Sequence, residues 1–409
     1  FASPRKALRE RDAVLQRMED VGFISPAQRE EAMASRPRIA QRAASTFQEN
    51  WAMHAILGEL DLVLDADQRD AGGLHIRTTI DPRLQRVAEE SLARRLAAAE
   101  KLPGFSHSPM SAYRGRDFSE ASSVPYLEGA AIAIDSRTGG IRAIVGGRNL
   151  RASSFNRAID ARRPVGSAAK PFVYAKAFEA GLKPNEKISD DRLAPSEMPA
   201  GFGNYSPGNS DGTFRGELPA AEGLIHSRNT MSVRVGLRAG LNRVADCIRL
   251  AGLAADPDPY PAICLGSFES NLKDLTAAYT AFANQGVKLQ PYLIEEITDA
   301  RGNVLFKATH GRIPILDRRA AESTAEIMRD VLTKGTGKGA RKLGAPRDAA
   351  GKTGTTNDYH DAWFVGFNRK LTCGVWVGFD QPRTIMPGGG GASLALPIWA
   401  DIMSAGGSD

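Results

Sequence analysis

The chain has 409 residues and a formal net charge of +6, with 42% hydrophobic and 24% charged residues. This length exceeds the size at which one hydrophobic core stops growing, so more than one domain is expected, and the composition is that of a globular protein. The sequence contains no block of like charges of the kind that would predict a nucleic-acid partner. No stretch approaches the roughly 20 consecutive apolar residues that span a membrane.

Cysteine and histidine are sparse and carry no ligand pattern. The cysteines at 247, 264 and 373 form no C-x-x-C pair, and the six histidines are scattered, so we expect neither a metal site nor a cofactor. A disulfide between Cys247 and Cys264 is conceivable, but buried free thiols are the preferred interpretation. Because Phe1 is not an initiator residue, we expect a processed or trimmed piece of a longer product, with any N-terminal membrane anchor outside it.

The first third of the chain predicts helices interrupted by one strand. In order, local patterns predict helices over 3–20, 25–35 and 47–64, a strand over 74–80, and a helix that begins at Asp81-Pro82. Ser25 followed by Gln28 is a capping-box pattern. Residues 101–125 are rich in Ser, Pro and Gly, so the main domain boundary is placed there.

The rest of the chain predicts a mixed domain. We expect first a hairpin over 129–145, a helix after Ser167, a loop over 194–216 and mostly helices over 220–286. After these we expect a short β segment over 292–307, strands from K-T-G onward over 362–367 and 371–379, and a helix over 394–403. Strands at both ends with helices between them predict an α+β fold. Its central antiparallel sheet of about five strands would join the first hairpin to the last three strands, flanked by helices.

A serine and a lysine lie three residues apart at the start of a helical run. The stretch over 163–172 reads Arg-Pro-Val-Gly-Ser-Ala-Ala-Lys-Pro-Phe and contains Ser167 and Lys170. On a helix these two side chains share a face, with Cβ atoms about 5–6 Å apart, so the amine can reach the hydroxyl and take its proton. Ser167 in the first turn would face unpaired N–H groups and the positive end of the helix dipole.

Two later motifs strengthen this hypothesis. Ser227-Arg228-Asn229 gives S-x-N, and Lys352-Thr353-Gly354 gives K-T-G. The order S-x-x-K, S-x-N, K-T-G is typical of penicillin-binding proteins and class A β-lactamases. Each motif alone also has a plain structural interpretation, as an N-cap serine, a capping Ser/Asn pair or a turn into a strand. Those interpretations do not explain three motifs in this order.

These residues resemble the class A penicillin-binding proteins, the bifunctional peptidoglycan synthases. Further segments that look like the family's transpeptidase domain are 163–167, 334–337 and 350–367, and the resemblance is strong over about 126–405. It implies a penicillin-binding or serine β-lactamase-like transpeptidase domain over 126–409, a linker region over 46–125 and the C-terminal tail of a glycosyltransferase domain over 1–45. Glycosyltransferase activity is therefore expected only in a full-length protein.

Motifs and resemblance together assign a role to each candidate residue. Ser167 is the expected nucleophile and Lys170 its base, whose pKa burial and the charge of Lys352 would lower. Ser227 would relay a proton to the leaving amine, and Asn229 would hydrogen-bond the backbone of the substrate.

The K-T-G strand edge is expected to hold the substrate. Lys352, Thr353 and Thr355 would bind a terminal carboxylate, and Gly354 would let the substrate backbone come close. The backbone N–H groups of Ser167 and Thr355 are the candidate oxyanion hole.

The resemblance implies a reaction and its partners. Ser167 would attack the penultimate D-Ala carbonyl of a donor stem peptide of peptidoglycan, release the last D-Ala and hold an acyl-enzyme. An acceptor stem peptide would resolve it into a cross-link, whereas water would give D,D-carboxypeptidase activity. β-Lactams would acylate the same serine, cell-wall synthesis proteins are expected partners, and the expected location is periplasmic, on the extracytoplasmic face of the inner membrane.

Two other functions stay open. One is a β-lactamase or β-lactam sensor of the same fold, although no deacylating base is evident; the other is a non-catalytic wall-binding module, against which the intact trio argues. The segment 334–339 has the glycines and lysines of a phosphate loop, but glycine follows Lys338 where Ser or Thr is required. We interpret it as a helix end and a loop near the active-site cleft.

Overall fold

The computed structural model describes residues 4–35, 50–118 and 123–407, and the chain divides into two compact units, Phe1–Gln48 and Glu49–Asp409. The first unit contains α1 (Pro4–Asp20) and α2 (Pro26–Ala34). Ser25 and Gln28 form the capping box predicted for α2. In the described part of the chain, no helix has the length and apolar character needed to cross a membrane.

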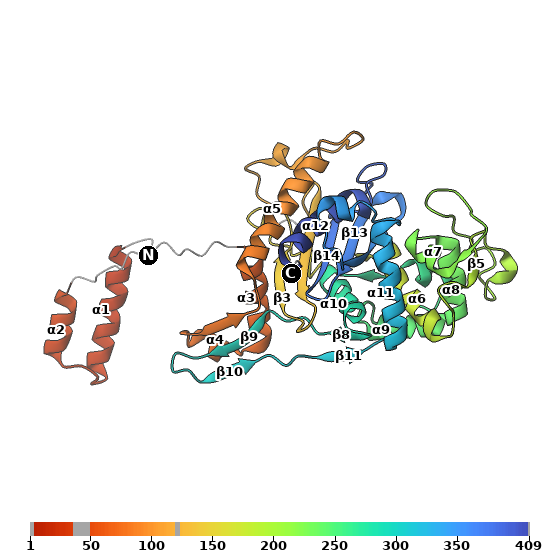
Figure 1. Ribbon diagram of the computed structural model, residues 1–409. Helices are drawn as coiled ribbons and strands as arrows, with labels where there is room; N and C mark the ends of the chain where they lie inside the picture. Colours follow the sequence, from red (N-terminus) through yellow and green to blue (C-terminus); the bar gives the residue numbers. More distant parts are fainter. Residues whose placement is uncertain (1–3, 36–49, 119–122, 408–409) are drawn as a thin grey trace. The chain divides into compact units, whose positions relative to one another are not determined.

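The second unit is built on a five-stranded antiparallel sheet (Figure 1). Its strands, in spatial order, are β12 (Ala350–Thr355), β13 (Asp361–Phe367), β14 (Leu371–Gly378), β2 (Glu128–Asp135) and β3 (Ile141–Val145). The first hairpin and the last three strands thus form one sheet, which confirms the predicted α+β fold. The K-T-G strand β12 lies at an edge of this sheet.

Helices cover both faces of the sheet because its side chains alternate between two apolar cores. Ile132 and Ile134 belong to the core that includes α10 (Leu272–Ala283), whereas Ala131 and Ala133 belong to the core that includes α5 (Pro82–Ala99) and α12 (Leu396–Gly406). This period of two is the pattern of a strand buried on both sides.

The region between β3 and β12 carries α10 and other helices between loops and short strands, and its helices over 220–286 confirm the predicted helical stretch. Its other helices are α6 (Lys170–Glu179), α7 (Ala220–Ile225), α8 (Asn229–Ala239), α9 (Leu241–Leu250) and α11 (Arg318–Thr333). Short strand pairs join its loops: β4 (Arg163–Pro164) with β7 (Glu269–Ser270), β5 (Lys187–Ser189) with β6 (Glu217–Pro219), and β8 (Val287–Leu289) with β11 (Arg312–Pro314). In Figure 1, α7, α8 and β5 lie in the green part of the second unit.

The residues expected to form a linker pack onto the rest of the second unit. They supply α3 (Trp51–Val63), the short α4 (Ala66–Asp70), which the sequence did not predict, and β1 (His75–Thr78). β1 pairs with β9 (Ile294–Thr298), which also pairs with β10 (Val304–Lys307). The carboxylate of Glu59 on α3 accepts hydrogen bonds from the N–H groups of Leu293 and Ile294. α3 is therefore tied to the same small sheet.

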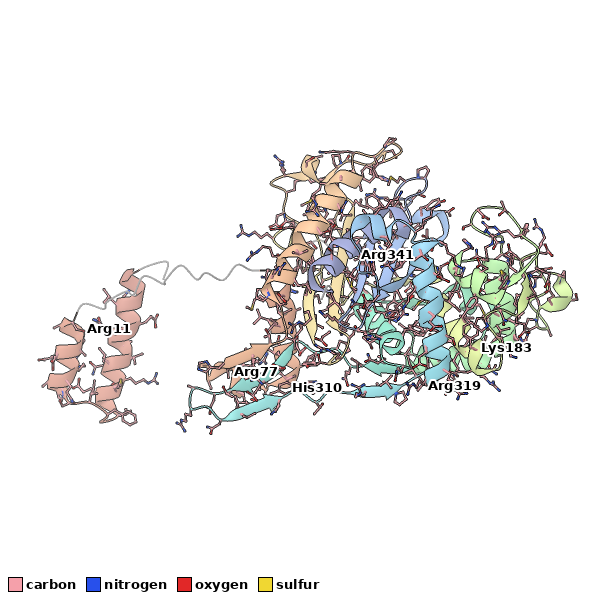
Figure 2. The ribbon with its side chains drawn as sticks, viewed as in Figure 1. Arg11, Arg77, Lys183, His310, Arg319 and Arg341 are labelled. Atoms are coloured by element: carbon pink, nitrogen blue, oxygen red, sulfur yellow. The ribbon has the colours of Figure 1, made fainter. Side chains whose placement is uncertain are left out.

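The three cysteines are buried and free, as preferred from the sequence. Figure 2 shows the exposed cations Arg77, Lys183 and Arg319 on the surface of the second unit.

Candidate active site

Ser167 lies in a 3-10 turn, Gly166–Ala169, directly before α6 begins at Lys170. It therefore precedes the first turn of the α-helix in which it was expected. Gly166 has a φ of +54°, and a Cβ there would lie 2.8 Å from the carbonyl oxygen of Thr355. The turn consequently packs directly on the end of β12, and only a glycine fits this contact without displacement.

Two buried lysines converge on Ser227. Lys170 and Lys352 are both 0% exposed although they come from α6 and β12. The Nζ atom of Lys352 donates to the Ser227 hydroxyl over 2.9 Å, and the Nζ atom of Lys170 donates to the same hydroxyl over 3.3 Å. The structure thus brings one member of each predicted motif to a single point.

Lys170 makes two shorter hydrogen bonds to the S-x-N motif. Its Nζ atom donates to the carbonyl oxygen of Ser227 and to Oδ1 of Asn229, each over 2.7 Å. Together with the longer contact to the Ser227 hydroxyl, these use all three donors of a lysine ammonium. Within the described residues, the Ser167 hydroxyl takes part in no hydrogen bond. The Ser167–Lys170 hydrogen bond expected from the spacing is therefore not formed in this state.

The pKa values of both lysines are lowered, mainly because burial disfavours their charged forms. Desolvation lowers the pKa of Lys352 to about 7. For Lys170 desolvation is again the largest cause, and the charges of Lys352 and Arg228 lower its pKa further, so that it lies well below its ordinary value. The lowered pKa favours loss of one ammonium proton; the neutral amine then gives up one of its three hydrogen bonds and gains a lone pair that can accept a proton.

The K-T-G strand presents hydroxyl groups that are already engaged. Thr353 is 6% exposed, and its hydroxyl lies 2.7 Å from that of Thr336, in the loop after α11. The hydroxyl of Thr355 accepts a hydrogen bond from the N–H of Gly391 over 3.2 Å. Both hydroxyls keep further hydrogen-bonding capacity, because a hydroxyl has one donor and two lone pairs.

Gly354 meets the serine turn rather than an open face of the sheet. A Cβ at Gly354 would lie 3.0 Å from the carbonyl oxygen of Val165 and 3.2 Å from the Cβ of Ala168. The sequence suggested that this glycine admits the backbone of a substrate. In the structure it admits the backbone next to Ser167.

Sequence reasoning missed several polar residues around the motifs. It placed Thr336 near the cleft but gave it no role, although the segment 334–339 had been singled out for its glycines and lysines. Asp190 and Asn209, which hydrogen-bond the residues around S-x-N, carry no spacing signal, because they lie 37 and 18 residues before Ser227. Only Asn209 falls within the predicted loop over 194–216.

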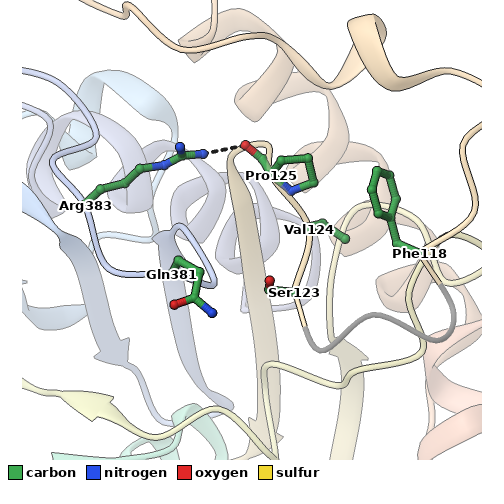
Figure 3. A pocket seen from close by; sticks show the side chains of 6 residues that line it. All are labelled: Phe118, Ser123, Val124, Pro125, Gln381 and Arg383. Carbon is green, nitrogen blue, oxygen red and sulfur yellow. Dashed lines mark hydrogen bonds between the residues drawn. The ribbon is translucent and has the colours of Figure 1, made fainter.

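A pocket of about 430 Å³ lies apart from these residues (Figure 3). It is lined by Phe118, Ser123, Val124, Pro125, Gln381 and Arg383. Arg383 donates a hydrogen bond across it to the carbonyl oxygen of Pro125. None of the predicted site residues lines this pocket, so the candidate chemistry stays with the lysine cluster.

Comparisons with known proteins agree with the motifs. A family model described as the penicillin binding protein transpeptidase domain matches residues 129–260 and 265–404. The chain is 37% identical to penicillin-binding protein 1A of Neisseria lactamica over 288 residues, which cover 68% of this chain and 36% of that protein. It is 31% identical to penicillin-binding protein 1A of Aquifex aeolicus in an alignment that covers 98% of this chain and 63% of that protein. The chain thus spans between about one third and two thirds of these relatives.

Solved structures share the fold. The crystal structure of penicillin-binding protein 1A from Haemophilus influenzae matches with a TM-score of 0.78 at 22% identity, covering 98% of this chain and 76% of that one. The PonA1 protein of Mycobacterium tuberculosis, in complex with penicillin V, matches with a TM-score of 0.68 at 26% identity, covering 87% of this chain and 92% of that one. The first likeness concerns the fold alone.

Proposed function

The chain belongs to the class A penicillin-binding proteins as their transpeptidase region, and from this premise we propose that it is a serine D,D-transpeptidase that cross-links peptidoglycan stem peptides through an acyl-enzyme on Ser167. The observation that carries the proposal is the meeting of Lys170, Lys352 and Ser227 beside the serine turn. A serine hydroxyl is a weak nucleophile until an adjacent base takes its proton, and a buried lysine with a lowered pKa is such a base.

In the acylation step, the Oγ atom of Ser167 attacks the penultimate D-Ala carbonyl while its proton passes to the neutral amine of Lys170. The backbone N–H groups of Ser167 and Thr355 stabilise the oxyanion. The carbon–nitrogen bond to the last D-Ala breaks as its nitrogen takes a proton through the Ser227 hydroxyl, which leaves an ester on Ser167.

In the second step, the amine of an acceptor stem peptide attacks this ester, forms the new amide and returns the proton to Ser167. Attack by water instead gives D,D-carboxypeptidase activity. A strained β-lactam amide acylates Ser167 in the same way, and the penicillin V complex of the PonA1 protein supports this part of the proposal.

Substrate carboxylate and backbone have separate partners in this proposal. Lys352, Thr353 and Thr355 hold the terminal carboxylate of the donor peptide, because a cation flanked by hydroxyls forms charge-assisted hydrogen bonds. Asn229 hydrogen-bonds the peptide backbone of the donor. Because Gly354 has no side chain, the turn that carries Ser167 packs closely against β12, the strand that binds the donor peptide. The reaction takes place at the extracytoplasmic face of the inner membrane, where the peptidoglycan substrate and the cell-wall synthesis partners are found.

Mass spectrometry after treatment with benzylpenicillin tests the proposal. We expect one adduct, on the peptide that contains Ser167, and none in Ser167→Ala. An adduct on another residue, or none in the wild-type chain, contradicts the proposal and favours a wall-binding module. The rate of adduct loss separates the remaining functions: retention over many minutes fits a synthase, whereas rapid release fits a β-lactamase.

A further inference from the structure

Ser227 occupies an uncommon backbone conformation. Its φ is +57°, in the left-handed region that a non-glycine residue seldom adopts. This conformation lets the side chain and the carbonyl of one residue face the same lysine: Lys170 donates to both its Oγ and its O atom. Such a conformation persists only when the surrounding structure holds it in place.

Neighbouring residues of the S-x-N motif cannot hold it by themselves. Arg228 is the N-cap residue of α8, but its side chain caps none of the free N–H groups of the helix. A residue from a distant loop supplies the cap. The Oδ1 atom of Asn209 accepts hydrogen bonds from the N–H of Asn229 over 2.7 Å and from the N–H of Thr230 over 3.4 Å.

A buried carboxylate fixes both Asn209 and Arg228. Asp190 is 0% exposed, and its carboxylate accepts hydrogen bonds from Nδ2 of Asn209 over 3.0 Å, from the hydroxyl of Thr230 over 2.7 Å and from Nε of Arg228 over 2.9 Å. Arg228 itself is 3% exposed. The loop that carries Asp190 and Asn209 is thereby locked onto the turn that carries Ser227.

We infer that Asp190, Asn209 and Arg228 are positioning residues for the proposed acyl transfer, because they hold Ser227 in the left-handed conformation that aims its hydroxyl at both lysines. The inference rests on the proposed function. Among the described residues, none of these three forms a hydrogen bond with Ser167 or with the Nζ atom of either lysine, so they position the site through the turn that carries Ser227 and Asn229. The charges of Arg228 and Asp190 also act on the pKa of Lys170, whereas Asn209 is neutral and tests the positioning alone. A misplaced Ser227 hydroxyl slows proton transfer without removing the carboxylate-binding strand.

The test separates the acylation rate constant from the binding constant. Fluorescent penicillin is mixed with the 409-residue chain, and the first-order rate constant of acylation and the apparent dissociation constant are obtained from the concentration dependence. Asp190→Asn and Asn209→Ala should each lower the rate constant about 10- to 100-fold while the dissociation constant changes less than about 3-fold, as for a displaced catalytic group. Asp191→Asn is the matched control, because Asp191 adjoins Asp190 but is exposed, and it should acylate like the wild type.

Each alternative outcome contradicts the inference in a different way. If Asp190→Asn fails to fold, the acylation rate constant of Asn209→Ala tests the inference instead, because this substitution leaves no buried charge unpaired. Acylation of both variants at the wild-type rate overturns the inference and leaves the proposed function intact. If a smaller fraction of the variant chains is labelled but those chains react with the wild-type rate constant, the residues have a purely structural role. That outcome also overturns the inference. Absence of acylation in the wild type overturns the proposed function and this inference together.

Discussion

Two amines that share one hydroxyl cannot both be fully charged at low cost. Lys170 and Lys352 both reach the hydroxyl of Ser227 in a site from which water is excluded, and like charges at this separation disfavour each other. Burial lowers the pKa of Lys352, and burial followed by the charges of Lys352 and Arg228 lowers the pKa of Lys170. Ser227 can then pass a proton between the two nitrogens, because its hydroxyl both donates and accepts. This is the property that the proposed mechanism uses.

Removal of the Lys170 amine should slow acylation by several orders of magnitude. Lys170→Ala is expected to lower the rate of penicillin acylation at Ser167 about 10²- to 10⁴-fold, the range that a positioned general base supplies. Lys176→Ala is the matched control: this lysine lies on the same helix, α6, but forms an ion pair with Glu179. Acylation of Lys170→Ala within ten-fold of the wild type would assign the base to another group.

The lowered pKa of Lys352 predicts how stability depends on pH. The folded-state pKa is about 7, and in the unfolded chain it returns to about 10.4. Between these values the unfolded chain binds a proton that the folded chain does not, so the free energy of unfolding should rise with pH, by up to about 1.4 kcal/mol per pH unit.

Lys352→Met isolates this contribution. Lys170 contributes in the same direction, so the variant should show a weaker rise than the wild type rather than none. Urea unfolding at pH 7, 8 and 9 measures the two slopes. Equal slopes in the two proteins would mean that Lys352 is charged in the folded state throughout this range.

At the scale of elements, the serine turn depends on backbone contact with β12. Gly166→Ala should lower the rate of acylation by about 10²-fold, because the new Cβ would lie 2.8 Å from the carbonyl oxygen of Thr355 and must push the turn away. Gly344→Ala is the control, since Gly344 also has a positive φ, of +88°, but its Cβ would meet only the hydroxyl oxygen of Ser404 at 3.6 Å.

Both alanine variants should lose stability through backbone strain, but only the first should lose activity. Thermal unfolding measures the strain that they share, about 1 kcal/mol each, and fluorescent penicillin measures acylation. A normal acylation rate in Gly166→Ala would show that the contact with Thr355 does not position Ser167.

The elements that the sequence predicted correctly carry their signals within a few residues. Asp81 caps α5 through the N–H groups of Arg83 and Leu84, and Ser25 and Gln28 cap each other at α2. The three motifs likewise named the residues of the lysine cluster, since each motif is local. The hydrogen-bonding partner of Lys170 could not be predicted, because Ser227 lies 57 residues away and has a left-handed backbone that no local pattern indicates.

At the scale of the whole molecule, chain order and spatial order differ. β1 pairs with β9 more than 200 residues later, and the five-stranded sheet joins strands from both ends of the second unit. The sequence predicts the five-stranded sheet from the strands at its two ends, whereas no local pattern indicates the pairing of β1 with β9, because the long intervening chain must be ordered before that pairing forms. The residues before β2 likewise join the second unit through long-range contacts. One example is the Glu59 carboxylate, which accepts hydrogen bonds from the N–H groups of Leu293 and Ile294.

Two truncations test this organisation. A chain that begins at Glu49 keeps every contact of the second unit, so it should unfold at the same temperature as the full chain and acylate at the same rate. A chain that begins at Asp81 lacks α3 and β1, which exposes the edge of β9 and leaves the N–H groups of Leu293 and Ile294 without the Glu59 carboxylate. It should unfold several degrees lower, because buried donors that lose their acceptor cost about 1–3 kcal/mol each. Thermal unfolding measures the stability of the three chains, and fluorescent penicillin labelling measures their acylation rates. A loss of acylation on removing residues 1–48 would show that the first unit supports the active site.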